Sequence, residues 1–197
     1  VSVQTPEEFL SGNNSSGTAL NDVEVRLGRY NTLEIRTPRL AKVLSPDGTV
    51  KSIDNKDGWW ETGDVAKLVF DNKIQQLQII GRHDTAITSG GETIFPEQLQ
   101  SRLFRSAQQS DIPLEALLLT PIKNEEWGER LIALVKFKAH KGNMKQEASF
   151  LKLKNIVKEW PTSQRPIAWY NCPELSKNKL GKWEINKWRE WVQAKGS

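Results

Sequence analysis

Residues 81–92 read GRHDTAITSGGE, and the pattern of the chain changes within this stretch. Before it, alternating apolar and polar residues at 23–27 (VEVRL) and 33–36 (LEIR) predict half-buried strands. After it, helical periodicity alternates with apolar runs of strand length. We therefore expect a domain boundary here, with a β-rich segment over 1–83 and a second domain over 84–197.

The second domain mixes both periodicities. Pro96 suits the first turn of a helix. Leu99, Leu103 and Phe104 then share one helical face. The apolar patterns also predict helices at 145–160 and 184–194, and strands at 114–122, 131–137 and 167–171. The expected fold class is α+β: a β-rich segment followed by a small antiparallel sheet flanked by helices.

The charges are distributed unevenly. The net charge is +4, but residues 1–120 carry 12 Lys and Arg against 16 Asp and Glu, a balance of −4. Residues 121–197 carry 16 against 8, a balance of +8. A basic C-terminal part is typical of an anion-attracting surface, which fits phosphate ligands as well as nucleic acid.

The composition excludes several classes of protein. No apolar run is long enough to span a bilayer, and residues 1–10 lack the basic and apolar regions of a signal peptide. The lone Cys172 makes no internal disulfide, and His83 and His140 are too few for a metal site. Because there is no initiator Met, we expect the chain to begin inside a longer protein, and we separately expect that protein to be cytoplasmic.

Two polar residues are candidate ligands for a ribose or a phosphate. Asp64 follows a glycine in the turn-like sequence ETGD (61–64), where its carboxylate could accept hydrogen bonds from a vicinal diol. Arg82 comes 18 positions later, after a strand that should return the chain to the same edge. Taken singly, each residue is more often a solvated surface side chain.

Two further segments are candidates for contact with a ligand. Gly90 and Gly91 carry no Cβ, so the backbone there could approach a thin ligand, although the same pair also suits a plain hairpin turn. Lys182 follows a glycine in a lysine-rich loop, from which an ammonium group could reach a phosphate. An isolated lysine of this kind is usually solvated.

Order and spacing make these segments more specific together than singly. GWWETGD (58–64), LQIIGRHD (77–84) and SGGE (89–92), with FPE (95–97) behind them, resemble consecutive signatures of the adenylate-forming superfamily. The Ser-Gly-Gly-Glu version resembles its acyl-CoA ligase branch. The resemblance extends over nearly the whole chain.

The C-terminal residues resemble one subgroup of that branch. QRPIAW (164–169), PEL (173–175) and WREWV (188–192) are similar to the tail of the 2-succinylbenzoate–CoA ligases of menaquinone and phylloquinone biosynthesis. Another acyl- or aryl-CoA ligase of the superfamily is the nearest alternative.

The resemblance implies an enzyme that activates a small carboxylic acid with ATP and passes it to coenzyme A. Asp64 would bind the ribose hydroxyls of ATP and of the acyl-adenylate, and Arg82 would support the same nucleotide. Asp84 would be the hinge about which a mobile C-terminal lid rotates between the two half-reactions. Gly90 and Gly91 would line the tunnel for the pantetheine arm of coenzyme A.

Lys182 would contact the α-phosphate and the carboxylate during adenylation. The family's Pro-x-x-x-x-Gly-Lys run is here SKNKLGK (176–182), so Lys177 and Lys179 are rival candidates, although the Gly-Lys register favours Lys182. The family's phosphate loop and its Mg²⁺-binding Thr-Glu segment would lie upstream of Val1. The resemblance therefore implies that the enzyme uses ATP and Mg²⁺, with the metal ligands upstream of this chain. It also implies that the chain alone is inactive.

Two other classes of function are kept as hypotheses. A basic nucleic-acid-binding module would show affinity that falls steeply with salt. A non-catalytic interaction domain would keep the scaffold and show no pyrophosphate exchange with any acid. We expect no nucleic-acid partner and no membrane span. We expect the missing N-terminal part of the same protein as a partner, and a homo-oligomer is a further possibility.

Overall fold

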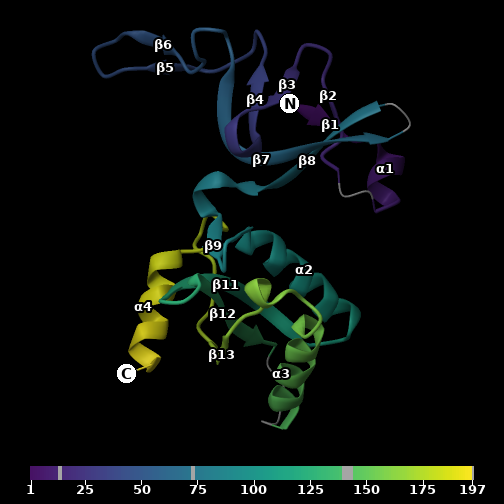
Figure 1. Cartoon of the computed structure of the whole chain (residues 1–197), viewed down its shortest axis with the longest axis vertical. Helices are drawn as coiled ribbons and strands as arrows, with labels where there is room; N and C mark the ends of the chain where they lie inside the picture. The colour runs from purple at the N-terminus through teal and green to yellow at the C-terminus, as the bar shows by residue number, and fades with distance from the viewer. Residues whose placement is uncertain (13–14, 72–73, 139–143, 197) are drawn as a thin grey trace. The chain divides into compact units, whose positions relative to one another are not determined.

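The computed structural model describes residues 1–12, 15–71, 74–138 and 144–196. The chain forms two compact units, Val1–Thr85 and Ala86–Ser197, called here the N-terminal and C-terminal units. Each has its own sheet (Figure 1). Each also has its own hydrophobic core. Among the described residues, no helix combines the length and apolar character needed to cross a membrane.

The N-terminal unit is built on a four-stranded antiparallel sheet of order β3-β4-β7-β8. Two small two-stranded sheets, β1–β2 and β5–β6, and one short helix complete it. Its strands and helix are β1 (Ser2–Val3), α1 (Pro6–Leu10), β2 (Thr18–Ala19), β3 (Glu24–Leu27), β4 (Thr32–Arg36), β5 (Lys42–Leu44), β6 (Val50–Ser52), β7 (Trp60–Asp71) and β8 (Ile74–Arg82).

The core of the N-terminal unit follows from the two-residue repeat of its strands. Leu33 and Ile35 on β4 point to one face and pack with Ala66 on β7 and Leu77 on β8, all at most 3% exposed. β8 pairs along nearly its whole length with residues 64–71 of β7, and this register places Asp64 opposite Arg82. The expected strands are confirmed.

The C-terminal unit has a five-stranded sheet with helices on both faces (Figure 1). Four strands run antiparallel in the order β10-β9-β12-β11, and β13 pairs with β12 in parallel. The elements are β9 (Ile87–Ser89), β10 (Glu92–Ile94), α2 (Pro96–Gln109), β11 (Leu114–Asn124), β12 (Gly128–Phe137), α3 (Met144–Val157), β13 (Ala168–Asn171) and α4 (Ile185–Gly196).

Both faces of this sheet are buried, which explains why β11 and β12 are continuous apolar runs. On one face, Leu117, Leu131 and Val135 pack against α2 and α3. On the other, Leu118 and Ile132 pack against α4 and the segment after β13. Burial of such a side chain contributes about 1.5–3 kcal/mol, so the two clusters fix the sheet between its helices.

The structure confirms the α+β class and corrects three details. The sheet is not purely antiparallel, because β13 runs parallel to β12. The helix expected at 145–160 ends at Val157, and Trp160 instead caps its end by donating its N–H to the Val157 carbonyl at 3.0 Å while staying buried. The short helix α1 was not expected. Of the two histidines, His140 lies outside the described residues.

Candidate functional site

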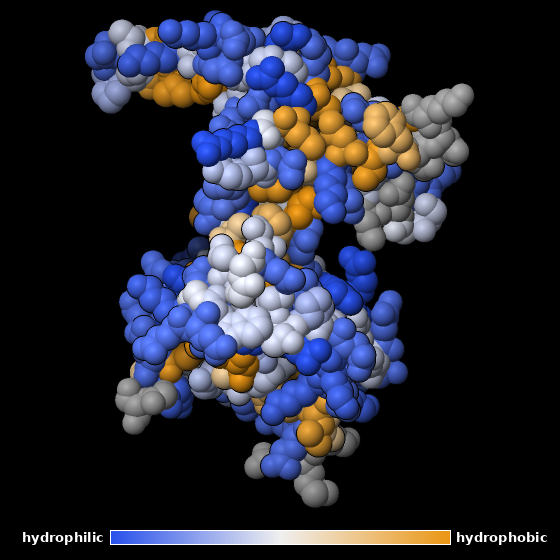
Figure 2. All heavy atoms as spheres, in the orientation of Figure 1, coloured by the Kyte–Doolittle hydropathy of each residue, from blue (hydrophilic) through white to orange (hydrophobic). Residues whose placement is uncertain are grey.

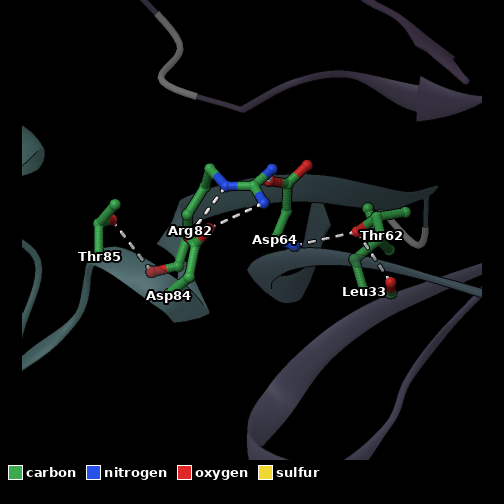
Figure 3. Close-up of polar contacts among 6 residues, drawn as sticks. All are labelled: Leu33, Thr62, Asp64, Arg82, Asp84 and Thr85. Atoms are coloured by element: carbon green, nitrogen blue, oxygen red, sulfur yellow. Dashed lines mark hydrogen bonds and ion pairs between the residues drawn. The ribbon is translucent and has the colours of Figure 1, made fainter. Parts of the chain in front are cut away.

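Three of the predicted site residues lie together in the N-terminal unit (Figure 3). Asp64 and Arg82 are direct register partners on β7 and β8. The Arg82 guanidinium lies 3.5 Å from the Asp64 carboxylate, and its Nε donates to the Asp84 carboxylate at 3.0 Å. One cation therefore joins the predicted ribose ligand to the predicted hinge residue.

Local backbone geometry positions Asp64. The hydroxyl of Thr62 accepts a hydrogen bond from the Asp64 N–H at 3.1 Å and donates one to the Leu33 carbonyl at 2.9 Å (Figure 3). Gly63 has a positive φ of 78°, and a Cβ there would lie 3.2 Å from the Arg82 guanidinium. The positive φ at this point of β7 favours a glycine, whereas the exposed Arg82 side chain could shift away from a Cβ.

Arg82 affects the charge state of the neighbouring Asp84 carboxyl. The hydrogen bond from Arg82 is the main cause that lowers the pKa of Asp84 below its ordinary value. The Asp64 side chain is 35% exposed and that of Arg82 is 53% exposed, so both remain accessible to a polar ligand. The arrangement offers one acceptor and one cation side by side, which can bind hydroxyl donors and anionic oxygens respectively.

Gly90 and Gly91 form the two-residue turn between β9 and β10. Ser89 pairs with Glu92, and both glycines have positive φ, 57° and 83°. Two consecutive positive φ values are the signature of a type I′ hairpin turn, which glycine adopts without strain. Of the two interpretations of the glycine pair, the structure therefore has the plain hairpin turn. The turn also leaves the backbone uncovered at Gly91, where a Cβ would meet nothing within 4 Å.

The side chain of Trp127 supports this turn from one side. The Gly90 N–H donates to the Trp127 carbonyl at 3.0 Å, and a Cβ on Gly90 would lie 2.6 Å from the indole ring. Arg130 packs over the same ring at 4.4 Å and donates to the Thr162 carbonyl at 3.0 Å. Gly90 is therefore required by packing as well as by its φ.

Lys182 lies at the end of a compact turn in the C-terminal unit. The side-chain oxygen of Asn178 accepts hydrogen bonds from the N–H groups of Leu180 and Lys182, both at 3.0 Å. Gly181, with a φ of 74°, closes the turn. The Lys182 side chain is exposed, and within the described part of the chain its ammonium group makes no ion pair.

The two rival lysines differ in their surroundings. The Lys177 ammonium lies 5.4 Å from the centre of the Trp183 ring, where it gains a cation–π contact. Lys179 is exposed at the tip of the same turn. Lys182 is the lysine whose backbone the turn holds, which agrees with the Gly-Lys register of the sequence.

Metal-binding side chains do not gather in the described residues. Among them, no three His, Cys, Asp or Glu side chains lie together as a possible metal site. Cys172 is fully buried, and burial is the main cause that raises its thiol pKa to about 11. A thiol with this environment is a core side chain rather than a nucleophile.

Sequence reasoning missed three residues that shape these turns: Thr62, Trp127 and Asn178. The turn at Asn178 could have been predicted from the sequence, because asparagine side chains commonly accept a hydrogen bond from the backbone N–H two residues ahead and a glycine follows at 181. The support that Trp127 gives to Gly90 carried none, because it depends on β9 and β12 being neighbours.

Several known proteins with sequences similar to this chain are acid–CoA ligases. The chain matches the C-terminal part of the AMP-forming acid–CoA ligases. Within that class it is similar to the 2-succinylbenzoate–CoA ligase of Salmonella typhimurium, with 26% identity over 185 residues. That alignment covers 90% of this chain and 36% of the relative, so the chain spans about a third of the relative's length.

Solved structures give the same correspondence, while no family model matches the chain. One of them is MenE, the o-succinylbenzoate CoA synthetase, of Escherichia coli with a bound analogue of OSB-AMS. It superposes with a TM-score of 0.65 at 25% sequence identity, and the match covers 92% of this chain and 36% of that structure. Bacillus subtilis MenE in complex with ATP and a magnesium ion superposes with a TM-score of 0.67 at 18% identity, over 96% and 38%, which shows the shared fold.

Proposed function

We propose that this chain is the C-terminal part of an ATP-dependent acid–CoA ligase. The enzyme adenylates a carboxylic acid and then transfers the acyl group to the thiol of coenzyme A. The observation that carries this proposal is the pairing of Asp64 with Arg82 directly before the unit boundary, together with an exposed Lys182 in the next unit.

Asp64 and Arg82 suit the nucleotide. A ribose presents two vicinal hydroxyl donors, and the Asp64 carboxylate is held by the Thr62 turn with its oxygens partly exposed. Arg82 lies 3.5 Å from that carboxylate and supplies donors for the nucleotide's own oxygens. Their roles are binding and orientation.

Lys182 suits the adenylation step. Attack of a carboxylate on the α-phosphate brings two anions together, so a cation must be present where negative charge accumulates. An exposed lysine on a turn with an otherwise fixed backbone can supply that charge and be withdrawn afterwards. Thioester formation then needs the same carbon to be open to a thiol.

A hinge at Asp84 would reconcile these two demands. Asp84 lies at the C-terminal end of the N-terminal unit, which ends at Thr85. Rotation of a lid about this point would exchange Lys182 for the Gly90-Gly91 turn at the reacting carbon. The uncovered backbone at Gly91 suits passage of the narrow pantetheine arm. We accordingly keep 1–83 as the end of the large domain and 84–197 as the lid.

The N-terminal unit has features of an incomplete domain. Figure 2 shows residues of high hydropathy gathered on its visible face. Its exposed apolar side chains include Phe9, Leu10, Val43, Leu44, Val50, Phe70 and Ile74. A stable soluble domain rarely leaves so many large apolar side chains in water. This supports our proposal that preceding residues of the same protein complete the domain and supply the phosphate loop and Mg²⁺ ligands.

We propose 2-succinylbenzoate as the acid, because relatives with that activity align over most of the chain. Another acyl or aryl acid is the alternative, since the residues that select the acid would lie outside this chain. We also propose a cytoplasmic enzyme without a nucleic-acid partner. Retention of the chain on DNA or RNA columns at low salt would contradict the last point.

The test is a panel of acids offered with ATP and coenzyme A to the complete protein, with AMP release as the readout. We expect AMP and acyl-CoA in equal amounts, with the highest kcat/KM for 2-succinylbenzoate over benzoate and a medium-chain fatty acid. The 197-residue chain alone should release no AMP. Absence of AMP with every acid would refute the proposed class, and preference for a fatty acid would refute the proposed substrate.

A further inference from the structure

A pocket of about 660 Å³ lies within the C-terminal unit. It is bordered by α2, by β11 and β12, and by the segment from Leu175 to Trp183. Its volume falls in the range of small-molecule sites in proteins. Neither Asp64, Arg82, the glycine turn nor Lys182 lines it, so the proposed function leaves it unused.

The charged groups of the pocket leave an excess of positive charge. The Lys136 ammonium lies 2.7 Å from the Glu115 carboxylate, so these two largely neutralise each other. Arg105 and Lys177 also line the pocket. Neither has a carboxylate partner among the residues placed in the structure, so two cations face the space without a counter-ion.

The apolar walls of the pocket are mainly aromatic. Phe104 on α2 and Trp183 before α4 are each half-buried. Leu117 and Leu175 lie behind these walls and, at 2% and 1% exposure, offer almost no surface of their own. The Lys177 ammonium lies 5.4 Å from the centre of the Trp183 ring, so positive charge and aromatic surface adjoin. A ligand that uses all of these features must be anionic and carry an apolar ring.

We propose that this pocket binds a small aromatic carboxylate. The guanidinium of Arg105 matches the two oxygens of a carboxylate, and Lys177 adds a second positive charge. The ring of the ligand packs against Phe104 and Trp183. Charge complementarity selects the carboxylate, and the aromatic walls select the ring.

Occupancy of the pocket would act on the turn that carries Lys182. Lys177 and Trp183 border that turn in the sequence and both line the pocket. A ligand that contacts both of them would hold the two ends of the Asn178–Lys182 turn at once. The inference does not depend on the proposed ligase activity, because it concerns binding to the C-terminal unit alone.

The test uses the 197-residue chain and 1-naphthoate as the probe. Calorimetry should show saturable binding, and NMR should show a shift of the Trp183 indole signal, assigned with a Trp183→Phe variant. Arg105→Gln should weaken binding about tenfold or more, the typical loss for a hydrogen bond to a charged group. Arg105 is exposed, so this variant should remain folded, which circular dichroism checks.

Arg102→Gln is the matched control, because Arg102 is an exposed arginine on the same helix that packs on Trp160 and does not line the pocket. It should bind 1-naphthoate as the unchanged chain does. The proposal is overturned if binding is not saturable or if the neutral 1-naphthamide binds as tightly. It is equally overturned if Arg102→Gln weakens binding as much as Arg105→Gln, or if the Trp183 signal does not move.

Discussion

Arg82 lies between two carboxylates, those of Asp64 and Asp84, at 3.5 Å and 3.0 Å. The proposed ribose ligand and the proposed hinge residue thus share one guanidinium (Figure 3). A change of backbone conformation at Asp84 would alter the second of these contacts, and with it the charge available to Asp64. Nucleotide binding and lid position are therefore expected to be coupled through Arg82.

This relationship predicts a titration. The hydrogen bond from Arg82 lowers the folded-state pKa of Asp84 below its ordinary value of 3.8, so the stabilisation is complete above pH 3.8 and is lost as the pH falls through the lower folded pKa. Arg82→Gln should bring the midpoint of Asp84 back towards 3.8 in carboxyl-carbon NMR. Arg36→Gln, which removes a cation paired with Glu24, should leave that midpoint unchanged. An unaltered midpoint in Arg82→Gln would contradict the contact.

The two glycines of the β9–β10 turn should differ in their tolerance of a methyl group. Both have positive φ, so alanine costs backbone strain of about 1 kcal/mol or more at either position. Gly90→Ala also drives a Cβ into the Trp127 ring, whereas Gly91→Ala meets open space. Urea unfolding should show a larger loss of stability for Gly90→Ala.

A second variant isolates the clash from the strain. In a Trp127→Leu background, the difference between Gly90→Ala and Gly91→Ala should shrink, because the ring that Cβ would meet is gone. If Gly90→Ala and Gly91→Ala lower the free energy of unfolding equally in a chain that keeps Trp127, the Trp127 ring moves aside without a loss of stability, and the predicted clash is contradicted.

Asn178 should fix the backbone of the lysine turn. Asn178→Ala removes the acceptor for the N–H groups of Leu180 and Lys182, so hydrogen exchange of both amides should accelerate about tenfold, as expected for the loss of one such bond. Asn178→Asp keeps an acceptor oxygen and should restore the protection. Fast exchange of both amides in the unchanged chain would contradict a preformed turn.

Cys172 should be inert in the folded chain. Its side chain is fully buried and its pKa is raised to about 11, so little thiolate exists at neutral pH. Alkylation at neutral pH should be slow in buffer and rapid in guanidinium chloride, as followed by mass spectrometry. Equal rates under both conditions would place the thiol at the surface.

The sequence predicted most elements because their apolar periodicity matches their burial. The repeat of Leu99 and Leu103 gives α2, and the unbroken runs of β11 and β12 reflect a sheet buried on both faces. Two further features are encoded locally in the sequence. Thr5 and Glu8 form a capping box around Pro6, where α1 begins. Asn178 precedes the glycine of the lysine turn.

Other features depend on tertiary contacts that periodicity does not encode. β13 follows β12 across α3, and a crossover of this kind is what parallel pairing needs, so the direction could not be predicted from residues 168–171 alone. The helical spacing of apolar residues continues to Trp160, but α3 ends at Val157. Trp160 is buried without being helical, so its apolar character does not show where the helix ends. The grouping of Asp64, Arg82 and Asp84 follows from the β7–β8 register.

The most direct test concerns Lys182 and separates the two half-reactions in the complete protein. In Lys182→Ala, acid-dependent pyrophosphate exchange should fall by about a thousandfold, a typical loss for one transition-state contact to developing charge. Thioester formation from supplied acyl-adenylate should continue at close to the unchanged rate, as should both steps in Lys179→Ala. A parallel loss of both half-reactions in Lys182→Ala, or unaltered pyrophosphate exchange, would contradict a lysine that serves adenylation and is then withdrawn.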